Sequence, residues 1–79
     1  MNRPDIFAKL TEVFHDVFEN DDIVLSDATK ADDIEGWDSL ANVRLMVTVE
    51  QAFRTKFSAA EISNLKNVGE MVSLIEQKV

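Results

Sequence analysis

The sequence has no cysteine and only one histidine, His15, and both features limit what the protein can be. Without cysteine there are no disulfides, and one histidine leaves no clustered ligand set for zinc. No stretch approaches the roughly 20 apolar residues that a membrane-spanning helix needs, and residues 1–5 lack the apolar part of a secretory signal. We therefore expect a cytoplasmic protein without stable membrane insertion, stabilised by packing alone.

Basic residues are also scarce, since 8 Lys and Arg stand against 15 Asp and Glu, for a net charge of -7. Such a surface repels nucleic-acid phosphates, which argues against nucleic-acid binding and against a DNA-binding helix-turn-helix. Basic protein surfaces are its natural complement. With 79 residues, 46% of them hydrophobic, the chain predicts one domain over residues 1–79, which we expect to be monomeric.

Apolar residues recur at helical spacing over residues 4–18, which predicts a first helix. Pro4 and Asp5 suit its first turn, because one needs no N–H donor and the other complements the helix dipole. His15 falls among the solvent-facing positions and is interpreted as a surface residue without a partner. The predicted inner face consists of Ile6, Phe7, Leu10, Val13, Phe14, Val17 and Phe18.

From Glu19 to Trp37 the periodicity stops and turn-forming Asn, Asp and Ser residues dominate. The segment is long for a link between helices, yet it is too apolar to be a disordered linker. We expect it to be pinned across the bundle, with a short helical turn near Thr29 to Asp33, and to hold Ser39 in an exposed position. The expected anchors are Ile23, Val24, Leu25, Ile34 and Trp37.

The acidic residues of this loop invite a calcium-binding interpretation, which the register excludes. Placing the required glycine at Gly36 puts Ala31 at the first loop position and Asn42 at the twelfth, where Asp and Glu are needed. A solvated acidic loop is the better interpretation.

A second helix is predicted from Ser39 to about Arg54, with Asp38 as its N-cap. Val43, Met46, Val49 and Phe53 are expected to face the core. Leu40 and Val47 lie to one side, where either a later helix covers them or they form an exposed strip for a partner.

Two shorter helices complete the predicted all-α fold of three main helices, one short helix and a long first loop. Ser58 to Glu61 matches a capping box and starts the short helix, which points Ile62 and Leu65 inward. Asn67 begins the last helix, whose buried stripe is Val68, Met71, Val72 and Ile75.

Ser39 is the strongest functional candidate. It falls in the first turn of its helix, where the unpaired N–H groups and the dipole would favour a phosphate on its hydroxyl. There is no histidine base near it in the sequence and no oxyanion-type glycine motif around it, which argues against an enzyme.

The order and spacing of these features resemble the acyl carrier protein family over nearly the whole chain. The resemblance rests on the amphipathic first helix, the acidic loop with Leu25 and Ile34, and Asp38-Ser39-Leu40 opening the second helix. It implies that Ser39 receives 4′-phosphopantetheine from coenzyme A through a separate transferase, and that the thiol of this arm holds acyl groups as thioesters.

The resemblance also implies the partners: a phosphopantetheinyl transferase, which Asp38 helps to attract, and enzymes that load, process or transfer acyl groups. The residues expected to contact them are Leu40, Val43, Arg44, Val47 and Glu50. Acyl chains of this family can enter the space between the helices, for which Val47, Ile62 and Leu65 are candidate lining residues.

The second helix departs from the family pattern, because Ala41, Arg44 and Gln51 stand where acidic residues are frequent. This charge change favours a specialised lipid or polyketide-type pathway over general fatty-acid synthesis. Three alternatives remain: an aminoacyl or peptidyl carrier of the same fold, an unmodified helical interaction module, and a regulatory phosphoserine at Ser39.

Overall fold

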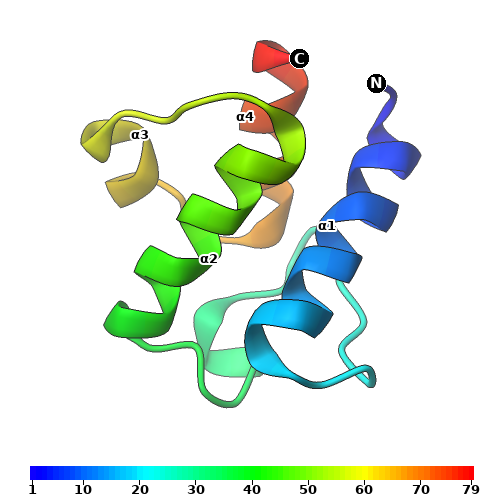
Figure 1. Ribbon diagram of the computed structural model, residues 1–79, viewed down its shortest axis with the longest axis vertical. Coiled ribbons are helices and arrows are strands. Elements are labelled where there is room, and N and C mark those ends of the chain that lie inside the picture. Colours follow the sequence, from blue (N-terminus) through cyan, green and yellow to red (C-terminus); the bar gives the residue numbers. More distant parts are fainter.

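The computed structural model describes residues 1–79 as an all-helical protein, and so confirms the predicted fold (Figure 1). Its four α-helices are α1 over Arg3–Phe18, α2 over Ser39–Phe53, α3 over Ala59–Ser63 and α4 over Val68–Lys78. α1 packs against both α2 and α4. No helix has the length and apolar character needed to cross a membrane.

The core is a single cluster of apolar side chains contributed by α1, α2, α4, the long loop and the segment between α2 and α3. The inner faces predicted for α1 and α4 supply most of it, while Phe7, Val17 and Phe18 are only partly buried. The fully packed members confirm that helical periodicity identifies these two faces. The cluster consists of Ile6, Leu10, Val13, Phe14, Ile23, Ile34, Leu45, Met46, Val49, Phe53, Phe57, Val68, Met71, Val72 and Ile75.

The predicted inner face of α2 is wrong at one position. Val43 is 61% exposed, whereas Leu45 is fully buried. At about 100° per residue, the buried positions from Leu45 to Phe53 span an arc of roughly 100°, and Val43 lies about 110° from its centre. The reason is that α2 directs this arc into the core as it packs on α1, which turns Val43 to solvent with Leu40 and Val47.

The long loop is pinned to the core, as predicted, but through fewer residues than expected. Ile23 and Ile34 are buried and Leu25 and Trp37 are partly buried, while Val24 is 85% exposed. Extended backbone points successive side chains to opposite sides, so Val24 must face away when its neighbours face inward. The expected helical turn is a 3-10 turn over Ala31–Asp33.

His15 was predicted to be a surface residue without a partner, and this is wrong. Its Nε2 lies 2.8 Å from the carbonyl oxygen of Ile23, and its Nδ1 lies 3.9 Å from the Asp21 carboxylate. A carbonyl oxygen only accepts, so Nε2–H is the donor. The contact arises because Glu19 is left-handed, with φ of 50°, and turns the chain back over α1.

The middle of the loop is tied to the start of α4 by backbone hydrogen bonds. Gly69 N–H donates to the Asp27 carbonyl at 3.0 Å, and Val68 N–H donates to the Thr29 carbonyl at 2.8 Å. Arg3 adds a third connection, since its Nη2 lies 2.8 Å from the Asp27 carboxylate and 3.3 Å from the Gly69 carbonyl oxygen. Thus α1, the loop and α4 meet at one junction.

The capping box predicted for the short helix α3 is confirmed. Glu61 N–H donates to the Ser58 hydroxyl at 3.1 Å, and Ser58 N–H donates to the Glu61 carboxylate at 2.8 Å. The hydrogen bond that Ser58 N–H donates to the Glu61 carboxylate lowers the pKa of Glu61 below its ordinary value. Lys78, at 3.2 Å from that carboxylate, adds a smaller contribution in the same direction. Asn67 caps α4 through Glu70 N–H at 2.8 Å, also as predicted.

Candidate functional site

Ser39 is exposed and is the first residue of α2. Asp38 precedes it as the N-cap, and its Oδ1 accepts a hydrogen bond from Ala41 N–H at 2.8 Å. The predicted cap is therefore confirmed, and it fixes the first turn of α2 without engaging the Ser39 hydroxyl. The hydroxyl sits at the positive end of a 15-residue helix, which favours an attached phosphate.

The chain reaches this position through a turn at Gly36 and an anchor at Trp37. Gly36 has φ of 88°, a left-handed conformation that a residue without Cβ adopts at little cost. Trp37 packs edge-on against Phe14, with ring centroids 5.2 Å apart, and its Nε1–H donates to Asn42 Oδ1 at 2.9 Å. The tryptophan therefore joins the end of the loop both to α1 and to the first turns of α2.

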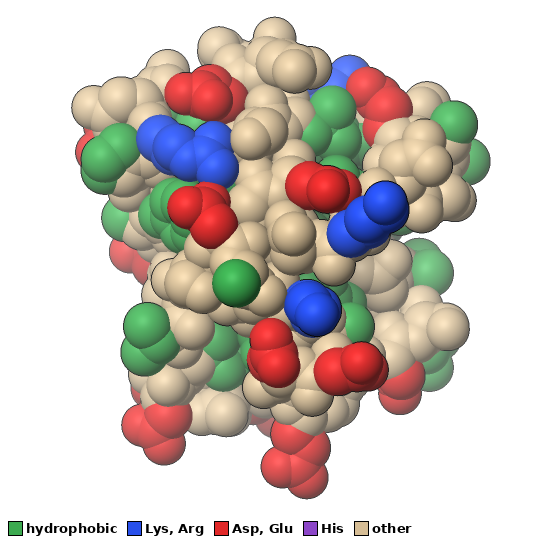
Figure 2. Space-filling view, turned by 180° about the vertical axis from the view of Figure 1, so that it is seen from behind, with side chains coloured by type: hydrophobic (Ala, Val, Ile, Leu, Met, Phe, Trp, Pro, Cys, Tyr) green, Lys and Arg blue, Asp and Glu red, His purple; other side chains and the backbone are tan.

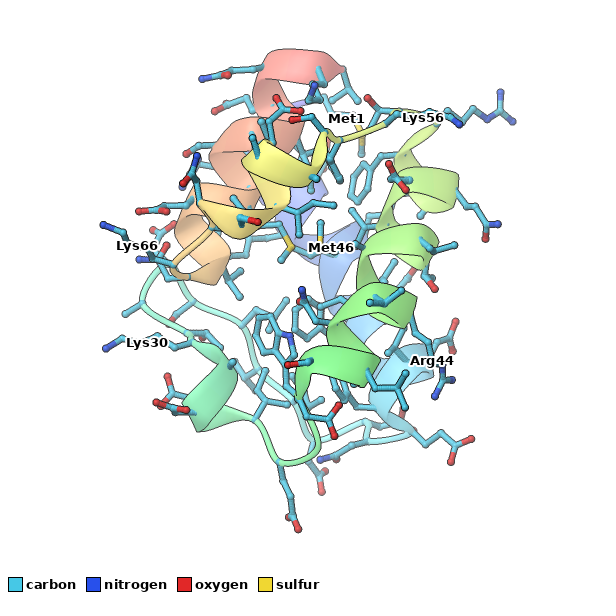
Figure 3. The ribbon with its side chains drawn as sticks, turned by 90° about the vertical axis from the view of Figure 1, so that its left-hand side faces the viewer. Met1, Lys30, Arg44, Met46, Lys56 and Lys66 are labelled. Atoms are coloured by element: carbon cyan, nitrogen blue, oxygen red, sulfur yellow. The ribbon has the colours of Figure 1, made fainter.

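A cavity of about 470 Å³ opens beside Ser39, between α2 and α3. Figure 3 shows Met46 pointing from α2 toward α3, where this space lies. Its lining mixes apolar and polar groups next to the candidate serine. The lining residues are Ala31, Trp37, Asp38, Ser39, Asn42, Met46, Ile62, Ser63, Leu65, Lys66, Asn67 and Met71.

The cavity contains two of the three residues predicted to line a space for acyl chains. Ile62 and Leu65 are on its wall, but Val47 is not, because it is 47% exposed on the outer side of α2. The sequence did not identify Asn42 or Met46 as lining residues. Helical spacing placed Met46 on the inner face, but no local signal says that part of that face borders a cavity.

The residues expected to contact partners lie on or near the outer side of α2. Leu40 is 76% exposed, and with Val43 and Val47 it forms an apolar row that no later helix covers. Arg44 is exposed beside this row. Glu50 differs from the others, since its carboxylate accepts the Phe57 N–H at 2.8 Å and links α2 to the segment after it.

The site contains no visible means of activating the serine as a nucleophile. The single histidine is on α1, and its ring is bound to the Ile23 carbonyl. A hydroxyl without a neighbouring base is a weak nucleophile at neutral pH. Ser39 is thus an exposed hydroxyl at a helix N-terminus with no histidine beside it.

Comparison with known proteins places the chain in a family. Residues 8–75 match the family model described as the phosphopantetheine attachment site. The chain belongs to the acyl carrier protein family. It is 31% identical over 78 residues to an acyl carrier protein of Thermotoga maritima, an alignment that covers 99% of this chain and 96% of the relative.

The chain is similar to a solved acyl carrier protein in both fold and sequence. The solution NMR structure of the holo acyl carrier protein from Geobacter metallireducens superimposes with a TM-score of 0.86 at 42% identity, covering 91% of this chain and 83% of that one. The cofactor expected from the sequence, covalent 4′-phosphopantetheine, is thereby confirmed at the level of the family. Acyl carrier proteins are carriers that interact with a phosphopantetheinyl transferase and with acyl-processing enzymes.

Proposed function

We propose that Ser39 is the attachment point of 4′-phosphopantetheine. One observation carries this assignment: Ser39 is an exposed hydroxyl at the N-terminus of α2, next to a cavity of about 470 Å³. The helix terminus suits the phosphate of the arm, and the cavity beside it offers apolar and polar groups to the rest of the arm and its cargo. The bound group supplies a thiol on a flexible arm, which holds acyl cargo as a thioester.

Ser63 provides a matched control for this assignment, because it is also exposed and lines the same cavity. Ser63 is the last residue of α3, so its hydroxyl lacks the helix N-terminus that favours a phosphate at Ser39. After incubation with coenzyme A and a broad-specificity transferase, fragmentation of the modified chain should place the added group on Ser39. Finding it on Ser63 or on another serine would refute the assignment.

We infer further that the chain works as a carrier without catalysis of its own, in a specialised lipid or polyketide-type pathway. The charge of α2 supports this, since Arg44 and Glu50 are its only charged residues and Glu50 is bound to Phe57 N–H. Charges at the edge of an interface act mainly on the encounter rate and on partner choice. A neutral α2 should therefore be a poor match for enzymes that select acidic carriers.

Reconstitution tests the pathway part of this proposal. The holo-protein and a housekeeping acyl carrier protein are each supplied to the complete set of elongation enzymes of general fatty-acid synthesis, and the rates of chain extension are compared. The proposal predicts that the holo-protein supports extension at least about tenfold more slowly. Equal rates would show that it serves general fatty-acid synthesis.

A further inference from the structure

The outer side of α2 carries an apolar row that nothing in the chain covers. Leu40, Val43 and Val47 are 76%, 61% and 47% exposed, and they are three of the six large exposed hydrophobic residues. The other three are Met1, Val24 and Val79, which lie at the chain ends or in the loop. Apolar surface concentrated on one helix, starting next to Ser39, is typical of a protein interface.

The charge around this row is opposite to that of the whole protein. Residues 39–57 hold three basic residues, Arg44, Arg54 and Lys56, and one acidic residue, Glu50. The Glu50 carboxylate is already bound to a backbone N–H, and none of the three basic side chains forms an ion pair. Figure 3 shows Arg44 and Lys56 projecting on the same side of the molecule.

Of the five basic residues elsewhere, two form ion pairs and three, Lys9, Lys30 and Lys66, form none. Arg3 pairs with Asp27 and Glu76, and Lys78 pairs with Glu61. On the face opposite to Figure 1, basic and acidic side chains also lie next to each other (Figure 2). Residues 39–57 differ from the rest of the chain in their excess of basic over acidic residues, which the net charge of -7 conceals.

We propose that α2 docks on partner enzymes whose contact surface is an apolar groove bordered by carboxylates, one of which pairs with Arg44. This inference rests on the proposed function, because the partner must reach the group attached at Ser39. Arg44 is five residues from Ser39, or about 7 to 8 Å along the helix axis, so both fall within one contact surface.

The chemistry favours a protein over an anionic polymer or lipid surface. Glu35 and Asp38 are exposed close to Ser39, and eight of the 15 acidic residues fall within residues 19–38. An extended anionic surface large enough to reach Arg44 would also meet these carboxylates and be repelled. A protein can place one or two carboxylates opposite Arg44 and Arg54 and uncharged groups elsewhere.

Two helical peptides serve as probes. Both carry the same Leu and Ile stripe; one has Glu at every flanking position and the other has Lys. Each is titrated into the ¹⁵N-labelled protein, in both the holo and the apo form, while amide shifts are followed by NMR. Attachment at Ser39 is measured separately by mass, so failure of attachment and failure of docking are distinguishable.

The proposal predicts that the Glu peptide shifts the amides of residues 40–47 and binds at least about fivefold more tightly than the Lys peptide. Raising the salt should reduce this preference, because exposed charges are screened. Arg44→Glu should abolish or reverse it. Lys30→Glu makes the same change in net charge on the other side of the molecule and should alter it less than about twofold (Figure 3).

Four results would overturn the proposal: equal or tighter binding of the Lys peptide, no binding of either peptide, shifts confined to another face, or equal effects of Arg44→Glu and Lys30→Glu. Self-association of the protein, in which a second copy of the chain covers α2, is a fifth result that would overturn it. It would appear as a dimer in sedimentation, with α2 amide shifts that change on dilution. Circular dichroism of each variant, with Arg44→Gln as a milder change, verifies that the fold is retained.

Discussion

Gly69→Ala should destabilise the protein, although glycine to alanine within a helix is usually favourable. Gly69 is the second residue of α4, and a Cβ on it would lie 2.8 Å from the Asp27 carbonyl oxygen and 3.1 Å from the Asp27 Cα. Both are backbone atoms that no rotamer change can move. The Gly69 N–H also donates to that same carbonyl at 3.0 Å, so the two segments cannot separate without breaking a hydrogen bond.

Two kinds of contribution to the free energy of unfolding of Gly69→Ala oppose each other. Helix propensity would favour alanine by up to about 1 kcal/mol. Overpacking of a close contact costs about 1 to 3 kcal/mol, and the loss of the hydrogen bond about 1 kcal/mol more. We expect a net loss of about 1 to 3 kcal/mol, which lowers the melting temperature of a domain this size by roughly 4 to 8 °C for each kcal/mol.

Urea unfolding followed by circular dichroism measures this change. Gln77→Ala, an exposed position of the same helix, is the control and should stay within about 0.5 kcal/mol of the parent protein. Modification of Ser39 should proceed normally in Gly69→Ala, because Asp38 still caps α2. A Gly69→Ala variant as stable as the parent, or more stable, would refute the close contact between the loop and α4.

Three further predictions concern the caps and the loop. Asp38→Ala should lower the free energy of unfolding in urea by about 1 kcal/mol, because it removes the cap of α2. Asp38→Asn should keep the stability but lower kcat/KM for the transferase about tenfold if the charge attracts that enzyme. Unchanged kcat/KM would exclude this role. The lowered pKa of Glu61 adds stability above its ordinary value of about 4.5, and this contribution disappears as the pH falls through the lowered pKa. Melting curves of the parent and Glu61→Gln should therefore converge at acid pH, and a constant gap would contradict the assignment. Asn42→Ala removes the acceptor of Trp37 Nε1–H and should lower the free energy of unfolding by about 1 kcal/mol. It should also move the fluorescence emission of the only tryptophan to longer wavelength. An unchanged emission spectrum would mean that the contact does not hold the loop.

Local chemistry in the sequence predicted the start of three helices. Asp38, Ser58 and Asn67 each cap a helix through a backbone N–H three residues later, and this depends only on neighbouring residues. The exposed position of Ser39 results from the cap together with the polar loop before it. The caps were predictable because no distant part of the chain is needed to form them.

Features that depend on distant contacts were predicted less well. Val43 and Leu45 are both apolar, and which of them is buried depends on where α1 contacts α2, which periodicity alone does not fix. His15 gains its partner only because the loop folds back over α1. The cavity beside Ser39 forms only when α2 and α3 lie at their final separation. No local sequence pattern therefore identifies Asn42 and Met46 as residues that line it.

The central claim is tested most directly by the intact mass of three proteins after incubation with coenzyme A and a broad-specificity phosphopantetheinyl transferase. The parent protein and Ser63→Ala should each gain one phosphopantetheinyl group, and Ser39→Ala should gain none. All three should have the same circular dichroism spectrum, since Asp38 still caps α2 in each. A gain by Ser39→Ala, or no gain by the folded, unmodified parent protein, would contradict the account.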